Sequence, residues 1–358
     1  MKSRSKLLEY LLALAISVVL ALVVGGVIMA LSGFDPLNGY RLMIEGAIGK
    51  PRLIGNTLAK SATLCLTALA TAIAAQAGIF NVGGEGQLYL GAIASAYVGA
   101  KLTGVSPLIG IPLCLLAAIV AGGLYAWVPG VLKVKMKVDE VVTTILLNSA
   151  AIYFCAFLAN GPLKTAERGI NSGTDSIDPS FMFGRLIRSS NLTQSIFLSI
   201  MIALLVWYVM RRTTAGFEMK LTGQNGRFAR YSGLKAERLA IGSMVVSGAI
   251  CGLVGMFEVF GLHKRFITTV SQEFYYDGML VAMMMRYQPL GIILMSLFFG
   301  AMKIGGSYME AQAGIPSSLV IIIQSIIIFF MAAEDGILQA FRDWRTRKQA
   351  ALTLTKGG

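Results

Sequence analysis

The sequence predicts an all-α polytopic membrane protein with about ten transmembrane helices, some of them short or broken, arranged in two weakly similar halves. Apolar residues make up 56% of the chain and charged residues only 14%, whereas about a quarter of the residues in soluble domains are charged. The mean hydropathy is +0.70. Apolar windows long enough to cross a bilayer as helices recur along the whole chain.

The first predicted span covers 11–31, which contains no charged residue. This run is longer than the apolar region of a signal peptide, and the residues after it make a poor cleavage site, so we expect the span to be retained. The outer segment 33–52 mixes polar and apolar residues and is expected to form a short amphipathic helix on the membrane surface. Nine further apolar windows follow, at 57–77, 87–103, 107–132, 138–160, 192–210, 238–262, 277–287, 289–305 and 315–334.

We interpret residues 1–358 as one transmembrane domain. The gaps between the windows divide it into a first span with its outer segment, two core halves, one outer loop, one inner loop and a tail. Glycine and proline interrupt both core halves, and such breaks at matching places point to a central path through the membrane. The parts are 1–54, the first core half 55–160, the outer loop 161–191, the inner loop 211–238, the second core half 239–335 and the tail 336–358.

Basic residues give the predicted orientation, because Lys and Arg accumulate on the cytoplasmic side of a membrane. They gather before the first span, in 133–137, in 211–238 and in the tail. An even number of spans places all four segments inside, so both termini are expected in the cytoplasm. The net charge of +13 is thus explained by topology and by contact with the lipid bilayer. No soluble basic domain remains for a nucleic-acid partner.

A polar cluster interrupts the apolar sequence at Asn81, Glu85 and Gln87, among glycines. Unpaired polar groups at membrane depth are costly, so this cluster is expected to have a use. Two readings remain open: the side chains contact a transported solute, or they bond the backbone groups that a broken helix leaves free. A glutamate flanked by glycines also suits the N-terminal cap of a helix that starts near Gly86.

The inner loop, Arg211 to Arg238, contains glycines that bound a segment, 227–231, long enough for one or two helical turns. This segment is either a docking site for another subunit or a basic loop lying on anionic lipid. The outer loop likewise is either a docking surface or a solvated connection. The chain has no G-x-x-x-x-G-K-[ST] phosphate loop, its four cysteines lie in apolar spans, and His263 is its only histidine. We therefore predict no catalytic residues, no metal site and no enzymatic activity.

The run GIFNVGGEGQ resembles the signature of the permease subunits of ABC importers for nucleosides and simple sugars, which are ribose-permease-like members of the branched-chain-amino-acid-permease superfamily. Four further segments are similar to the family's pattern in the family's order, so the resemblance covers most of the chain. They are Asp139 to Asn148, Thr222 to Gly233, Gly248 to Glu258, and Gln324 with Ser325. The inner loop departs from the pattern, because Gly226, Arg227 and Phe228 stand where the family commonly has proline followed by small residues.

The resemblance implies a permease of the bacterial inner membrane that pairs with a second permease, as a heterodimer in view of the form of the signature and the chain length. Cytosolic ATPase subunits would bind the ATP, so the chain itself needs no cofactor, and an extracellular or periplasmic binding protein would deliver the substrate. The expected substrate path includes Asn81, Glu85, Gln87, Asn148 and Glu258, with Lys60 and Arg286 as candidate countercharges. The expected ATPase-coupling residues are Asn225, Arg227, Arg230, Tyr231 and Gly233.

A second class of function stays open on the sequence alone. A secondary transporter driven by an ion gradient needs intramembrane carboxylates that bind a cation. Glu85 and Glu258 are both available for that purpose.

Overall fold

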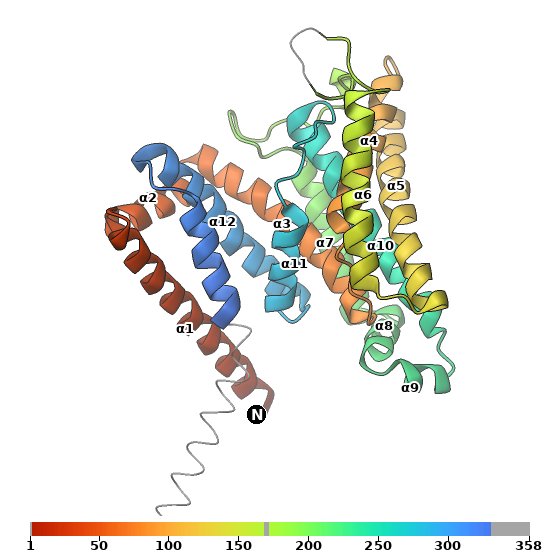
Figure 1. Ribbon diagram of the computed structural model, residues 1–358, viewed down its shortest axis with the longest axis horizontal. Helices are drawn as coiled ribbons and strands as arrows, with labels where there is room; N and C mark the ends of the chain where they lie inside the picture. Colours follow the sequence, from red (N-terminus) through yellow and green to blue (C-terminus); the bar gives the residue numbers. More distant parts are fainter. Residues whose placement is uncertain (1, 168–171, 331–358) are drawn as a thin grey trace, which may run out of the picture. The chain divides into compact units, whose positions relative to one another are not determined.

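The computed structural model describes residues 2–167 and 172–330, with side chains from residue 16 onward. Within these ranges the chain is helical and forms no β-strand. The all-α class predicted from the sequence is therefore confirmed (Figure 1). The predicted tail, 336–358, lies outside the described residues.

Each apolar window of the sequence falls on a helix as far as the structure describes it, and 331–334 of the last window lie outside the described residues. The α-helices of the first part are α1 (Lys2–Leu31), α2 (Pro36–Ile48), α3 (Pro51–Gln76), α4 (Gly84–Lys101), α5 (Pro107–Met136) and α6 (Glu140–Asn160). The helices of the second part are η1 (Pro179–Phe181), α7 (Ser195–Arg212), α8 (Thr214–Gln224), α9 (Gly226–Tyr231), α10 (Ala236–Glu258), η2 (Val259–His263), α11 (Phe274–Met284), α12 (Pro289–Ala313) and a final apolar helix, Ser318–Phe330.

The chain divides into two compact units, one formed by 1–46 with 305–358 and the other by 47–304. In the first unit, Gly25 of α1 faces Ile323 of the last helix, and a Cβ at Gly305 would lie 2.2 Å from the carbonyl oxygen of Met43. The helices of the first unit thus approach one another closely at glycines. The larger unit holds the polar helix break and the inner loop.

Among the described residues, six helices are long and apolar enough to cross a membrane, namely α3, α5, α6, α7, α10 with η2, and α12. In contrast, α11 has only 11 residues, which at 1.5 Å per residue reach about 16 Å, roughly half of a hydrocarbon core. The short window predicted at 277–287 is therefore present as a short helix, whereas the window at 289–305 belongs to the 25-residue helix α12. Together these features define a polytopic membrane protein.

Helix α10 is the centre of the larger unit, because it packs against α5, α4 and α3 (Figure 1). Its glycines allow the neighbouring backbones to approach closely. A Cβ at Gly252 would lie 2.2 Å from the carbonyl oxygen of Ala118 in α5, and one at Gly255 would lie 2.1 Å from that of Leu88 in α4. Small residues at helix crossings are the usual means of helix association in membranes. Here they fix α4 against α10 directly beside the polar break.

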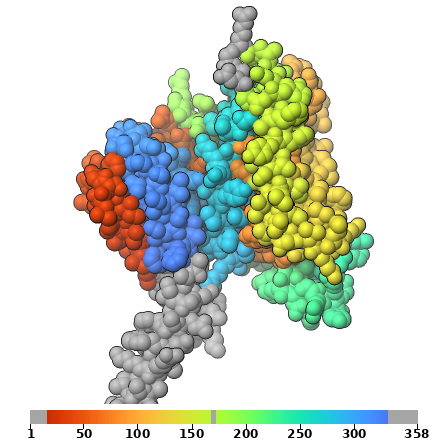
Figure 2. Space-filling view, in the orientation of Figure 1, coloured from red at the N-terminus to blue at the C-terminus, as the bar shows by residue number. Residues whose placement is uncertain are grey.

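Helix α7 connects the outer loop to the inner loop, so these two loops lie at opposite ends of the larger unit. Glu167 of the outer loop forms an ion pair at 2.7 Å with Arg265, which follows η2. At the other end, the blue-green segment around α8 and α9 projects beyond the ends of the yellow helices α5 and α6 (Figure 2). The inner loop is therefore ordered as two short helices.

Candidate functional site

The polar cluster lies in the break between α3 and α4. Asn81 and Gln87 are both buried, and their amides pair with each other, with Asn81 Nδ2 donating to Gln87 Oε1 at 2.9 Å and Gln87 Nε2 donating to Asn81 Oδ1 at 3.2 Å. Asn81 Nδ2 also donates to the hydroxyl of Ser247 at 3.0 Å, and its Oδ1 accepts from the Gly83 amide. These bonds satisfy the polar groups of the break and tie the break to α10.

Glu85 and Asn148 each cap a helix other than their own. Asn148, on α6, accepts a hydrogen bond from the backbone N–H of Gly86 and donates to the Tyr276 hydroxyl at 2.6 Å. Glu85 Oε2 accepts from the backbone N–H of Tyr275 at 3.0 Å, in the first turn of α11. Free N–H groups at a helix start favour such acceptors, and the helix dipole favours a carboxylate there.

This geometry corrects one detail of the sequence interpretation. Helix α4 starts at Gly84. Its N-cap residue is Gly83, which has no side chain to accept a hydrogen bond from the free N–H groups of the first turn. Glu85 was expected to cap that helix near Gly86, but its carboxylate instead caps α11, which lies 190 residues along the chain. The expected chemistry was right and the partner was wrong, because Asn148 already fills the position at Gly86.

Replacing Glu85 by alanine is expected to lower the free energy of unfolding by about 1–2 kcal/mol, the usual cost of losing a helix cap. Glu85→Gln should cost less, because the amide oxygen still accepts a bond from Tyr275. Thermal unfolding of the purified protein in detergent measures both changes. A Glu85→Ala protein of normal stability but altered solute selectivity would instead assign Glu85 to solute contact.

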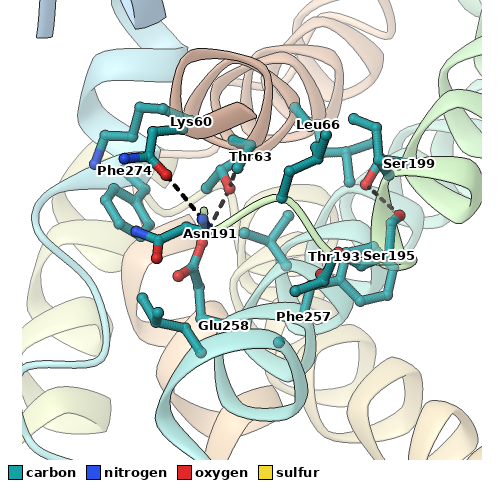
Figure 3. Close-up of a pocket in the computed structure, with 18 of the residues that line it drawn as sticks. Lys60, Thr63, Leu66, Asn191, Thr193, Ser195, Ser199, Phe257, Glu258 and Phe274 are labelled. Atoms are coloured by element: carbon teal, nitrogen blue, oxygen red, sulfur yellow. Dashed lines mark hydrogen bonds between the residues drawn. The ribbon is translucent and has the colours of Figure 1, made fainter. Parts of the chain in front are cut away.

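A cavity of about 200 Å³ lies between α3, α7, α10 and the segment before α11. Glu258 faces this cavity, and its Oε1 accepts a hydrogen bond from the Thr63 hydroxyl at 2.9 Å (Figure 3). The ammonium of Lys60 lies 3.7 Å from the centroid of the Phe274 ring, within reach of a cation–π interaction. The cavity therefore brings a carboxylate and a cation together within the larger unit.

The predicted path residues thus fall into two groups. Asn81, Glu85, Gln87 and Asn148 come together around the break, where their hydrogen bonds join α4, α6, α10 and α11. Glu258 stands apart from them and lines the cavity. For the group around the break, the structure shows hydrogen bonds that hold the broken helices together, as the second interpretation of the polar cluster predicts.

Sequence analysis did not predict the roles of Tyr275 and of Asp277, which lie on α11. Tyr275 donates its hydroxyl to the Asn81 carbonyl, and a Cβ at Gly84 would lie 2.0 Å from the Tyr275 ring. Lys303 forms an ion pair with Asp277, which was not recognised as an intramembrane carboxylate. The run of two tyrosines and an aspartate at a break was the available signal.

The inner loop forms two capped helices. The side chain of Thr213 accepts from the Gly216 N–H at the start of α8, and Asn225 accepts from the Phe228 N–H at 3.0 Å at the start of α9. Gly233, with φ of +81°, follows α9 in the left-handed conformation that favours glycine. Two aromatic side chains of α9 are exposed, Phe228 at 54% and Tyr231 at 93%.

The predicted coupling residues all lie on or beside α9. Arg227, Arg230 and Tyr231 are on the helix, and Arg230 is 3.9 Å from Glu237 in an exposed ion pair, which contributes little to stability. The helix begins at Gly226, so the departure from the family pattern at 226–228 does not displace it. Basic and aromatic side chains therefore form an unshielded surface on α9.

The end of α8 touches the polar break directly. A Cβ at Gly223 would lie 2.2 Å from the carbonyl oxygen of Gln76 and 2.9 Å from the Gly78 nitrogen. Gly78 itself has φ of +81°, which allows α3 to end and the chain to turn toward Asn81. The inner loop and the polar break are thus in backbone contact.

A polytopic helical bundle with a polar helix break, a polar cavity and an exposed short helix at one end defines the class of membrane permeases. The chain belongs to the family described as branched-chain amino acid transport system / permease component, whose model matches residues 53–332.

Three relatives show the extent of the similarity. The guanosine ABC transporter permease protein NupP of Bacillus subtilis is 32% identical over 338 residues, which cover 93% of this chain and 96% of the relative. The nucleoside ABC transporter permease protein NupB of Lactococcus lactis is 32% identical over 351 residues, 96% of each chain. The glucose ABC transporter permease protein TsgB13 of Haloferax volcanii is 30% identical over 338 residues, 89% of this chain and 86% of the relative. No solved structure matches the chain.

Proposed function

We propose that this permease subunit forms the translocation path for a nucleoside in an ATP-driven importer, with a simple sugar as the second candidate substrate. The similarity to guanosine, nucleoside and glucose permeases along most of the chain supports this proposal. Nucleosides and sugars both offer hydroxyl groups, which amide and carboxylate side chains bind by hydrogen bonds. We propose that the polar side chains either line the translocation path or hold together the helices that line it. These residues are Asn81, Glu85, Gln87, Asn148 and Glu258.

The exposed helix α9 is the observation that carries the coupling part of the proposal. Its end caps, Asn225 and the left-handed Gly233, hold it as a rigid unit, while Phe228 and Tyr231 are exposed on it. Large exposed aromatic side chains beside arginines are typical of protein-binding surfaces. A groove on a cytosolic ATPase subunit is the proposed partner, and the ATPase would bind the ATP.

The other partners follow from the same proposal. A second, different permease subunit would complete a heterodimer, and an extracellular or periplasmic binding protein would dock on the outer loop, 161–191. Basic residues at 133–137 and 211–238 support an orientation with these segments and both termini in the cytoplasm of a bacterial cell. Copurification with an ATPase and with a second permease tests these assignments.

Uptake measurements test the function directly. Cells that lack the chain and cells that regain it are given labelled guanosine or labelled ribose. We expect guanosine uptake to return with the chain, to stop with vanadate and to persist with a protonophore. Uptake that survives vanadate but stops with the protonophore would favour the alternative, a secondary transporter that uses Glu85 or Glu258 to bind a cation.

Replacing Tyr231 by alanine is expected to reduce uptake at least tenfold while the membrane spans stay folded. The side chain is 93% exposed, so its loss removes partner contacts, and truncation of such an aromatic anchor commonly costs about 2 kcal/mol or more of binding free energy. Copurification of the ATPase and labelled uptake are measured together. Unchanged uptake by Tyr231→Ala would remove α9 as the coupling site.

A further inference from the structure

The cavity beside α10 differs from the polar break in what its carboxylate does. Glu85, in the break, is buried and is bonded to the N-terminus of α11. Glu258 faces the cavity, and among the described residues its carboxylate accepts one side-chain hydrogen bond, from the Thr63 hydroxyl. A carboxylate accepts about four hydrogen bonds through two oxygens. Glu258 therefore retains acceptor capacity on the cavity side.

The backbone at Glu258 is also unusual. Helix α10 ends as an α-helix at Glu258, and a π-helix, Val259–His263, follows at once. π-Helical turns are rare and occur often at functional sites. The cavity is lined on this side by Gly261, Leu262 and His263 of the same turn. The local change of helix type thus occurs at the residue that presents its carboxylate to the cavity.

A cation, Lys60, lines the same cavity as Glu258. The ammonium of Lys60 lies over the Phe274 ring (Figure 3). Among the described residues no ion pair joins Lys60 to Glu258, so the cation does not cover the carboxylate oxygens. Asn56 and Asn191 add amide groups to the cavity wall, and the Asn56 side-chain oxygen accepts from the Asn191 backbone N–H at 2.8 Å.

We propose that Glu258 accepts hydrogen bonds from the vicinal hydroxyls of a ribose ring, either within a nucleoside or as the free sugar. The two oxygens of a carboxylate match two neighbouring hydroxyl donors, and acidic residues bind ribose hydroxyls in this way in dinucleotide-binding folds. The inference rests on the proposed function, since it specifies which part of the solute is recognised. It makes Glu258 the residue that distinguishes ribose from deoxyribose.

Binding to the purified transporter tests this assignment. The complete complex of permeases and ATPases is placed in lipid nanodiscs without the external binding protein, so that only the path is measured. Guanosine, 2′-deoxyguanosine and ribose are titrated separately. The wild type is expected to bind guanosine about tenfold more tightly than 2′-deoxyguanosine, since a bond to a charged group is lost. In Glu258→Gln the ratio is expected to fall to about twofold or less.

Two further variants complete the experiment. Glu258→Asp keeps the charge beside Lys60 but withdraws the carboxylate, so an intermediate ratio is expected even if Glu258→Gln does not accumulate. Glu310→Gln removes an exposed carboxylate of α12, which does not line the cavity, and should keep the wild-type ratio. Binding of ribose that matches guanosine and shares its sensitivity to Glu258→Gln would identify the free sugar as the source.

The outcomes separate this inference from the proposed function. Chain-dependent guanosine uptake together with equal ratios in the wild type, Glu258→Gln and Glu258→Asp would overturn the role of Glu258 and leave the importer standing. If the wild-type complex binds neither guanosine nor ribose detectably, the role of Glu258 is overturned as well. Absence of chain-dependent uptake of both guanosine and ribose would remove the proposed function itself.

Discussion

Replacing Gly252 by alanine is expected to prevent most of the chain from accumulating in folded form. An added Cβ would lie 2.2 Å from the carbonyl oxygen of Ala118 in α5. A Cβ at Gly91 of α4 would in turn lie 2.3 Å from the Gly252 Cα. Because backbone atoms occupy both sides, a rotamer change cannot relieve the clash and α10 must separate from its neighbours. Overpacking of a tight core costs about 1–3 kcal/mol, and we expect the upper end of that range or more.

The same helix supplies a matched control for this prediction. At Gly242 a Cβ would meet no atom within 4 Å, so Gly242→Ala should leave packing unchanged and gain up to about 1 kcal/mol of helix propensity. Fluorescence-detected size exclusion and thermal unfolding in detergent compare the two variants. Equal stability of Gly252→Ala and Gly242→Ala would contradict the close packing of α10 against α5.

The sequence predicted the helices well because apolar windows and glycine or proline breaks are local signals. Within the described residues every predicted window falls on a helix, and Gly226–Tyr231 forms the short helix expected between the glycines of the inner loop. Asn225 and Gly233 occupy the ends of that helix, since end preferences depend on a few neighbouring residues. These features need no knowledge of tertiary contacts.

The contacts around the polar break could not be predicted in the same way. The Glu85 carboxylate is bonded to Tyr275, and the Asn148 amide is bonded to Gly86 and Tyr276. These pairs are separated by between 62 and 190 residues. Residue type indicated that a polar group needs a partner, but only the packing of α11 and α6 on α4 decides which partner it finds. Helix packing likewise decides that Glu85 is bonded to the start of α11 while Glu258 faces a cavity.

The contact between the inner loop and the polar break predicts a route from α9 to the proposed path. Gly223, near the end of α8, lies two residues before Asn225, the cap of α9. Its backbone rests on Gln76 and Gly78, which lead into the segment with Asn81. We therefore propose that a displacement of α9 passes to the end of α3 through these backbone contacts, without an intervening flexible side chain. Rigid packed elements of this kind transmit movement between distant sites.

Gly223→Ala is accordingly expected to reduce uptake at least tenfold while the complex still assembles and hydrolyses ATP. The new Cβ would lie 2.2 Å from the Gln76 carbonyl oxygen, so α8 must move away from the break and α9 loses its rigid connection. Lys220→Ala, an exposed change on the same helix, is the control and should retain wild-type uptake. Vanadate-sensitive ATP hydrolysis and labelled uptake are measured on the same preparations. If ATP hydrolysis is retained while uptake is lost, this contact is part of the coupling route. If uptake and hydrolysis instead fall together with the abundance of the complex, Gly223 acts only in folding.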